Sequence, residues 1–375
     1  MKDPENPFII NTYHSPEYFC NRTNETERLI SAIKNGRNIT LFSIRRLGKT
    51  SLIQHVFHNL NQNSDYLLVY SDMLPTSNIS EFVSVLAKAV LQAESSNQST
   101  LKKLMASLSK LRPTISSDAL TGNPEFSVNV GNDSDAVSSI EILLSYLDNH
   151  AKIVICAIDE FQQITNYPEK NMEARLRTSI QLLKKTRFIF SGSSKTILSE
   201  IFTHPKRPFF NSTEIMELKG IDPIEYRAFI KKHFVNKKKQ ISDEALTQIQ
   251  NVTEFHTFYV QYMCNKLYQK AKKTIEKEEI NNVYLQILEE NQAVYSTYLQ
   301  LLTPFQFKLL RAIASDSPIL AITGSSFLSK HSLGSPSSVN RASTSLLSKE
   351  LIYIEADGYR LQDKFFSGWL KRTKV

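Results

Sequence analysis

Cysteine is scarce in this sequence, and its three copies lie far apart. They are Cys20, Cys156 and Cys264. A disulfide framework or a metal-ligand cluster needs several cysteines at short, regular spacings. The sequence therefore excludes both, and we interpret the three residues as small buried thiols.

Long apolar runs are also missing. The longest purely apolar run, Ile153 to Ile158, is far too short for a membrane-spanning helix, which needs about 20 residues. The first residues, Met1 to Pro7, lack the apolar stretch of a secretion signal. We therefore expect a cytoplasmic protein with no membrane contact.

The charge of the chain is positive but not extreme. The formal net charge is +8 and the sequence pI is near 9.1. Residues 301–375 carry ten Lys or Arg against five Asp or Glu. This balance permits contact with nucleic acid or another anionic partner without requiring it.

A chain of 375 residues is also long enough for two or three domains.

The most informative stretch has the pattern of a phosphate-binding loop. Residues 39–42 have the apolar character of a buried strand, and helical apolar spacing follows Thr50. The predicted loop consists of Ser43, Ile44, Arg45, Arg46, Leu47, Gly48, Lys49, Thr50 and Ser51. Gly48 allows the backbone to approach an anion, and Lys49 can reach the β- and γ-phosphates of ATP. The Thr50 hydroxyl is predicted to bind Mg²⁺.

This loop departs from the usual pattern G-x-x-x-x-G-K-[ST] at one position. Ser43 stands where the first glycine is expected, although a small residue can still fit that turn. The alternative interpretation is a glycine turn before an ordinary helix.

A second signal follows about a hundred residues later. The apolar run Ile153 to Ile158 predicts a central parallel strand, and ligands bind at the carboxyl ends of such strands. Asp159 is predicted to hold Mg²⁺ through water, and Glu160 to orient or deprotonate the attacking water. We expect this strand to be the neighbour of strand 39–42. Taken alone, the two acidic residues could also simply cap a strand.

Two further residues are candidates for contact with the γ-phosphate. Ser193 follows the predicted strand 187–190 and is expected to sense this phosphate, with a helix N-cap as the alternative. Arg207, held beside Pro208, is predicted to be an arginine finger for its own site or for that of a neighbouring molecule. A plain surface arginine is the alternative.

The pattern of elements predicts three domains. Residues 1–220 are expected to form an α/β P-loop core with a parallel sheet, interrupted by an insertion at about 94–139. For this insertion we expect a short helix over 101–111 and a hairpin. Residues 221–300 have helical patterns only and are predicted to form an all-α lid.

Residues 301–375 are predicted to form a winged helix-turn-helix domain. Three helices are followed by a hairpin of strands 351–354 and 358–361. The third helix, over 335–347, is rich in Ser, Asn and Arg, as a helix that reads a DNA groove can be. Many such domains instead bind a protein or only their own chain, so the partner stays open.

Together these segments resemble the archaeal-type AAA ATPases, P-loop proteins grouped with the signal-transduction NTPases and common in archaea and Bacteroidetes. The resemblance rests on Tyr18 to Arg22, Ser43 to Leu52, Arg112 to Pro124, Ile158 to Phe161, Ser191 to Ser194, Arg207 to Phe209, and the C-terminal segment that contains Trp369. Family members are similar in having Ser at the position of Ser43. Residues 255–261 depart from the family, which tends to have Gly-x-Pro there.

These observations lead to three functional hypotheses. The first is Mg²⁺-dependent binding and slow hydrolysis of ATP, used as a conformational switch of core, lid and winged helix with a regulatory role. The second is an ATP-dependent DNA-binding protein that acts through its winged helix. The third is a nucleotide-binding scaffold without turnover. A protein partner and a nucleotide-dependent homo-oligomer are compatible with all three.

Overall fold

The computed structural model describes residues 4–95, 102, 104–106, 114–117, 124–127, 133–236, 238–270 and 273–373. The chain divides into two compact units. The N-terminal unit is Ser15–Lys219, and the C-terminal unit combines Met1–His14 with Gly220–Val375. The sequence had placed residues 1–14 in the core. The boundary between lid and winged helix stays a prediction.

Aromatic packing explains why the N-terminal residues belong to the C-terminal unit. Phe8 is fully buried and makes edge contacts with Phe229, His233 and Tyr268. The amide of Asn265 also donates a hydrogen bond to the carbonyl oxygen of Phe8. Apolar burial of a large ring therefore anchors this segment.

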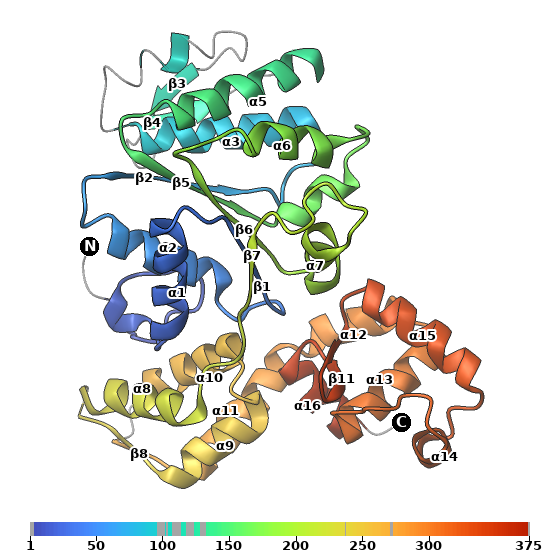
Figure 1. The fold of residues 1–375 in the computed structure, drawn as a ribbon. Helices are drawn as coiled ribbons and strands as arrows, with labels where there is room; N and C mark the ends of the chain where they lie inside the picture. Colours follow the sequence, from blue (N-terminus) through green and yellow to red (C-terminus); the bar gives the residue numbers. More distant parts are fainter. Residues whose placement is uncertain are drawn as a thin grey trace. The chain divides into compact units, whose positions relative to one another are not determined.

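The N-terminal unit is built around a five-stranded parallel sheet (Figure 1). In sheet order the strands are β2 (Tyr66–Asp72), β5 (Ile153–Asp159), β6 (Arg187–Gly192), β1 (Ile39–Phe42) and β7 (Glu214–Glu217). The helices are α1 (Thr23–Lys34), α2 (Lys49–Leu60), α3 (Ile79–Ala93), α5 (Asp133–Asp148), α6 (Met172–Ile180) and α7 (Lys195–Thr203). The predicted P-loop fold is confirmed.

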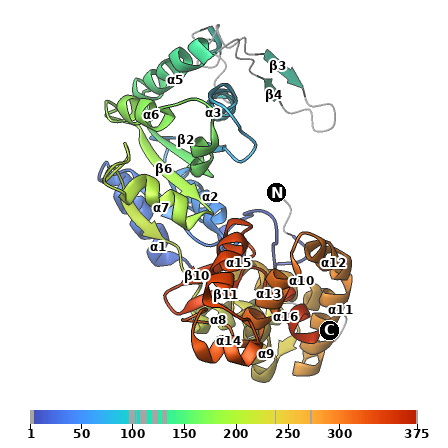
Figure 2. The same cartoon turned by 90° about the vertical axis from the view of Figure 1, so that its right-hand side faces the viewer.

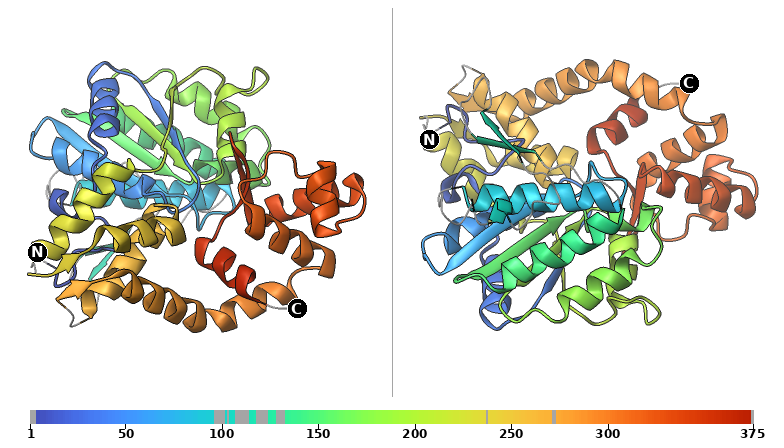
Figure 3. Two further views of the ribbon diagram at one scale, coloured as in Figure 1. Left: turned by 90° about the horizontal axis from the view of Figure 1, so that it is seen from below. Right: turned by 90° about the horizontal axis from the view of Figure 1, so that it is seen from above.

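The two faces of the sheet are covered by different helices. Because side chains alternate along a strand, Ile155 and Ala157 of β5 pack with residues of α1 and α2. Val154 and Cys156 point the other way, into the core formed with α3, α5, α6 and α7. Figure 3 (right) shows α3 and α5 side by side over this second face.

One expectation about the sheet is wrong. Strands 39–42 and 153–158 are not neighbours, because β6 lies between them. Ile189 of β6 pairs with Ile39 on one side and with Ala157 on the other. A continuous apolar run shows that a strand is buried on both faces, but it does not encode which strand lies next to it.

The insertion is described only in part. Strands β3 (Thr114–Ser117) and β4 (Pro124–Ser127) pair antiparallel, which agrees with the expected hairpin. Most of the helix expected over 101–111 lies outside the described residues. The following helix, α5, begins at Asp133, within the region assigned to the insertion.

Residues 221–300, the predicted lid, contain helices and one small strand pair. Its helices are α8 (Pro223–Asn236), α9 (Asp243–Thr253), α10 (Thr257–Gln269), α11 (Lys277–Glu290) and α12 (Gln292–Gln300). Strands β8 (Gln240–Ile241) and β9 (Thr274–Ile275) pair in parallel, which the helix-only expectation did not include. Helix α10 ends at Gln269, before β9 begins at Thr274.

The C-terminal residues form a winged helix (Figure 2). Its elements are α13 (Pro304–Asp316), α14 (Ser325–His331), α15 (Pro336–Ser348), β10 (Ile352–Glu355), β11 (Gly358–Leu361) and α16 (Lys364–Arg372). A capping box between Thr303 and Gln306 fixes the start of α13. Among the described residues, no helix combines the length and the apolar character that crossing a membrane requires.

Candidate active site

The predicted phosphate-binding loop connects β1 to α2. Arg46 and Gly48 have left-handed φ angles of 63° and 97°, so the chain turns sharply before the helix begins at Lys49. Glycine adopts such a φ angle without steric cost. Gly48 is the N-cap of α2 and provides no side-chain cap, which leaves the positive end of the helix dipole suited to an anion.

The loop side chains differ in exposure. Ser43, Leu47 and Lys49 are buried, Arg45, Arg46 and Thr50 are exposed, and Ile44, Gly48 and Ser51 are intermediate. The ammonium of Lys49 lies 3.4 Å from the hydroxyl oxygen of Ser43. Burial lowers the pKa of Lys49, whereas the nearby carboxylates of Glu160 and Asp159 raise it. The structure thus brings the loop lysine into the field of the two predicted acidic residues.

Asp159 connects the loop helix to the sheet. Its side chain is only 3% exposed. The Thr50 hydroxyl donates a 2.7 Å hydrogen bond to Asp159 Oδ2. This bond joins α2 to β5 even though β1 and β5 are not neighbours. The two predicted Mg²⁺ ligands therefore lie in direct contact.

Three more donors hold the same carboxylate. The Tyr70 hydroxyl donates to Asp159 Oδ2 at 2.9 Å, and the Ser191 hydroxyl donates to Oδ1 at 2.6 Å. The backbone N–H of Glu160 also donates to Oδ1, at 3.0 Å. Burial, and then the charge of Asp159, raise the pKa of Tyr70 above its ordinary value, so this phenol is a neutral donor at physiological pH.

Glu160 has a left-handed backbone conformation, and hydrogen bonds fix the position of its carboxylate. Its φ angle is 52°. Glu160 Oε2 accepts hydrogen bonds from the Ser193 backbone at 3.2 Å, from the Ser193 hydroxyl at 2.8 Å and from the Gln162 amide. Ser194, not Ser193, is the N-cap of α7. The structure therefore places Ser193 beside Glu160.

Gly192 provides the space for this arrangement. A Cβ atom added there would lie 2.0 Å from Oε1 of Gln162 and 3.3 Å from a methyl group of Leu198. The amide that donates to Glu160 therefore packs directly over the glycine. Gly192 is therefore needed because Gln162 and Leu198 pack closely against it, and not because the backbone has an unusual conformation there.

Comparison with known protein families agrees with this geometry. A family described as an ATPase domain predominantly from Archaea matches residues 19–256. This match spans more than half of the chain. The chain belongs to this ATPase family. A second family, described as a probable winged helix domain, matches residues 293–372.

Solved structures resemble this archaeal-type ATPase over nearly its whole length. A Walker-type ATPase from Pyrococcus abyssi is 17% identical with a TM-score of 0.67, and the match covers 97% of this chain and 99% of that one. The Aeropyrum pernix ORC2 protein, solved in ADPNP and ADP complexes, is 12% identical with a TM-score of 0.56 and 97% coverage of both chains.

A third similar structure is the Aeropyrum pernix ORC1 protein in complex with DNA. It is 12% identical with a TM-score of 0.51, and the match covers 95% of this chain and 93% of that one. At these low identities the likeness shows the fold alone. No curated protein sequence matches this ATPase.

Arg207 of this ATPase is engaged by acidic side chains of the same unit. Its guanidinium lies 2.7 Å from Glu173 Oε1 on α6 and 3.1 Å from Glu200 Oε1 on α7. Burial raises the pKa of Glu173, and the charge of Arg207 lowers it. The contacts of Arg207 in this structure are therefore with two carboxylates, and its role as a finger stays a prediction.

Three residues at the site of this ATPase were given no role from the sequence. The Tyr70 and Ser191 hydroxyls contact Asp159, and the Gln162 amide contacts Glu160. In the sequence, Tyr70 has the pattern of a packed strand residue, and Gln162 lies in a short 3-10 helix (Phe161–Asn166). The one available signal was their position in the sequence, because these residues lie near the carboxyl ends of predicted strands, where parallel sheets bind ligands.

Arg22 is a further residue that the sequence pattern did not single out for a role. It is buried and has a left-handed φ angle of 71°. Its guanidinium donates to the carbonyl oxygen of Leu47 at 3.4 Å and to Glu25 at 2.8 Å. Arg22 thus ties the segment before α1 to the phosphate-binding loop.

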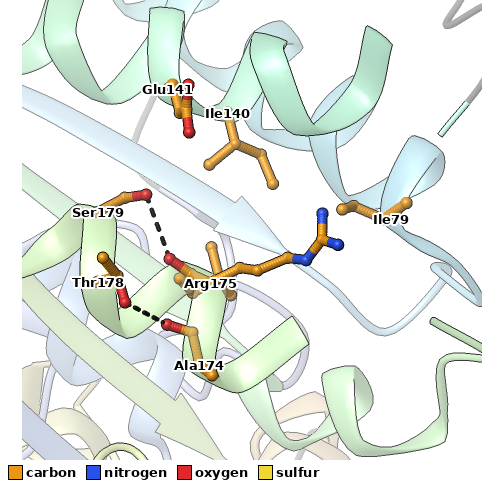
Figure 4. Close-up of a pocket in the computed structure, with 8 residues that line it drawn as sticks. Ile79, Ile140, Glu141, Ala174, Arg175, Thr178 and Ser179 are labelled. Carbon is orange, nitrogen blue, oxygen red and sulfur yellow. Dashed lines mark hydrogen bonds between the residues drawn. The ribbon is translucent and has the colours of Figure 1, made fainter. Parts of the chain in front are cut away.

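A separate pocket of about 280 Å³ lies between α3, α5 and α6 (Figure 4). It is lined by Ile79, Ile140, Glu141, Ala174, Arg175, Leu176, Thr178 and Ser179. Figure 4 shows the Arg175 side chain extending toward Ile79. None of the predicted site residues lines this pocket.

Proposed function

We propose that this protein binds ATP with Mg²⁺ at the loop of residues 43–51 and hydrolyses it slowly. The contact of Thr50 with Asp159, beside Lys49 and Glu160, carries the proposal because it joins the two motifs that such chemistry needs. Hydrolysis would switch the arrangement of core, lid and winged helix, which gives the protein a regulatory role.

The residues fit a Mg²⁺ ion. Among the described residues, no group of three or more His, Cys, Asp or Glu could hold a metal ion. Magnesium does not need such a cage, because it prefers oxygen ligands and uses one or two protein groups together with phosphates and water. The Thr50 hydroxyl and the Asp159 carboxylate are ligands of this kind. When bound, the ion would neutralise charge on the phosphates.

The other residues have distinct roles in this proposal. The backbone from Ser43 to Ser51 and the N-terminus of α2 would cradle the phosphates, and Lys49 would neutralise their charge. Glu160 would orient or deprotonate the attacking water, and Ser193 would position Glu160 and contact the γ-phosphate. The hydrogen bond between Ser193 and Glu160, at the carboxyl edge of the sheet, supports these roles.

Replacing Lys49 with alanine should abolish ATP binding. The change removes the buried cation of the site, so we expect the Kd for ATP with Mg²⁺ to rise by at least about 100-fold. Isothermal titration calorimetry measures this directly. Lys34→Ala, which removes an exposed lysine at the end of α1, should keep the wild-type Kd. A wild-type chain without affinity for ATP would refute the proposed function.

A second candidate function is DNA binding through α15. The exposed side of this helix carries Ser337, Asn340, Arg341 and Thr344, whereas Val339 and Leu346 are buried. The exposed residues lie three or four positions apart, so they share one helix face. The ORC1 protein of Aeropyrum pernix, which has a similar fold, was solved with DNA.

Arg341→Ala should weaken binding of duplex DNA if α15 is a DNA-binding helix. The logarithm of the DNA affinity falls with the logarithm of the salt concentration, and one lost phosphate contact would make this slope less steep by about 0.9. Fluorescence anisotropy at several salt concentrations can measure this change. Lys371→Ala, on α16, is the control for net charge. If wild-type protein does not bind duplex DNA at low salt with ATP present, the DNA-binding hypothesis is excluded.

A further inference from the structure

Tyr70 lies on the strand next to the one that ends in Asp159. Strands β2 and β5 pair in parallel, with Tyr70 opposite Ala157 and Asp72 opposite Asp159. Alternation along both strands puts Tyr70 and Asp159 on the face of the sheet that α1 and α2 cover. The loop helix and the Tyr70 hydroxyl therefore approach Asp159 from the same layer.

The Asp159 carboxylate is held from both sides in the sheet. Oδ2 accepts from Thr50 and Tyr70, and Oδ1 accepts from Ser191 and from the backbone of Glu160. A carboxylate has about four acceptor positions. Since β2 and β6 flank β5, Tyr70 and Ser191 hold the two oxygens from opposite neighbouring strands.

Asp159 has little freedom to adopt another rotamer while these contacts persist. It is buried, so an acceptor position that lost its donor would carry a desolvation cost. Loss of the Tyr70 hydroxyl leaves Oδ2 with Thr50 as its remaining side-chain donor among the described residues. Thr50 would then have to hold this oxygen and serve as a metal ligand at the same time.

We propose that Tyr70 is a positioning residue for the metal site: its hydroxyl holds Asp159 beside Thr50 and thereby sets the affinity of the site for Mg²⁺. This inference rests on the proposed function. Tyr70 acts through Asp159 and touches neither nucleotide nor metal in this proposal. Partners that orient a metal ligand typically contribute about 10-fold to 100-fold to metal affinity or activity.

Tyr70→Phe tests this inference, with Tyr66→Phe as its matched control. Both changes remove one hydroxyl from the same face of β2 and keep the packed ring. Tyr66 pairs with Ile153, at the other end of β5 from Asp159. A difference between the two variants therefore reports on the bond to Asp159 and not on tyrosine packing in the strand.

The measurement is the Mg²⁺ dependence of binding of a fluorescent ATP analogue by the full chain. Tyr70→Phe should raise the Mg²⁺ concentration for half-maximal binding by about 10-fold and leave nucleotide affinity unchanged without metal. Tyr66→Phe should follow the wild-type curve. Ser191→Ala, which removes the donor on Oδ1, should shift the curve in the same direction as Tyr70→Phe.

The outcomes separate the inference from the function on which it rests. If wild-type protein binds no nucleotide at any Mg²⁺ concentration, both are wrong. If it binds with a Mg²⁺ dependence that Tyr70→Phe does not change, only the inference is wrong. Thermal melting provides the remaining check: a Tyr70→Phe chain that is unfolded under conditions where Tyr66→Phe is folded would show that the hydroxyl serves stability, which also overturns the inference.

Discussion

Arg207→Ala should lower ATP turnover by about 10³-fold to 10⁵-fold while ATP remains bound. An arginine finger contributes a rate factor of this size because it neutralises charge that develops on the γ-phosphate. In the structure the guanidinium contacts Glu173 and Glu200 instead. We therefore expect it to exchange these carboxylates for phosphate in its own site or in that of a neighbouring molecule. Phosphate release at saturating ATP, beside calorimetric ATP binding, measures both quantities.

Two variants test whether Arg207 has a purely structural role. Glu200→Gln removes the charge of the more exposed carboxylate partner, whose side chain is 50% exposed, so the protein should lose little stability. If Arg207 only links α6 to α7, then Arg207→Ala should lower the melting temperature and leave ATP turnover intact. That result would make Arg45 or Arg46, inside the loop, the next candidates for the finger.

A mixing experiment tells whether the finger acts within one molecule or between two. Arg207→Ala retains its own ATP site, and Lys49→Ala retains its own Arg207. If the finger acts on a neighbouring molecule, a mixture of the two variants should recover part of the turnover that each lacks alone. No recovery, together with inactive Arg207→Ala, would place the finger in its own site.

Glu160→Gln should abolish most turnover and leave ATP bound. The change removes the carboxylate that would orient or deprotonate the attacking water, and such catalysis contributes about 10²-fold to 10⁴-fold. The amide keeps the shape of the side chain and can still accept a hydrogen bond from Ser193. We expect slow phosphate release without an initial burst, measured by stopped-flow, and a wild-type Kd for ATP, measured by calorimetry.

The control for this variant is Glu141→Gln, an exposed carboxylate on α5 beside the separate pocket. It should retain wild-type turnover and affinity. If the wild-type chain itself hydrolyses no ATP above the Glu160→Gln background yet binds it, the third hypothesis, a nucleotide-binding scaffold without turnover, would describe the protein.

The elements that could be predicted are those with strong local patterns. The apolar run before Asp159 predicted a buried strand, and β5 extends over Ile153–Asp159. Helical spacing after Thr50 predicted α2, which begins at Lys49. The start of α13 has a local signal of the same kind, because Thr303 is its N-cap and Pro304 its first residue.

Contacts between distant elements could not be predicted in this way. The parallel sheet was expected, but β6 separates the two strands that were expected to be neighbours. Strands β8 and β9, within the predicted lid, are each only two residues long, which is too short to leave a recognisable sequence pattern. Arg207 was predicted from its place before Pro208, and its two acidic partners come from α6 and α7.

The sequence alone determined the chemical groups of this ATPase and their order along the chain: a loop with Lys49 and Thr50, and a strand ending in Asp159 and Glu160. Residue spacing along the chain is enough to identify both motifs, because each one lies where a single strand ends and the next element begins. Only the tertiary structure decided which groups hold Asp159. Tyr70 and Ser191 come from strands on either side of β5, and apolar alternation specifies the face of a strand but not its neighbour.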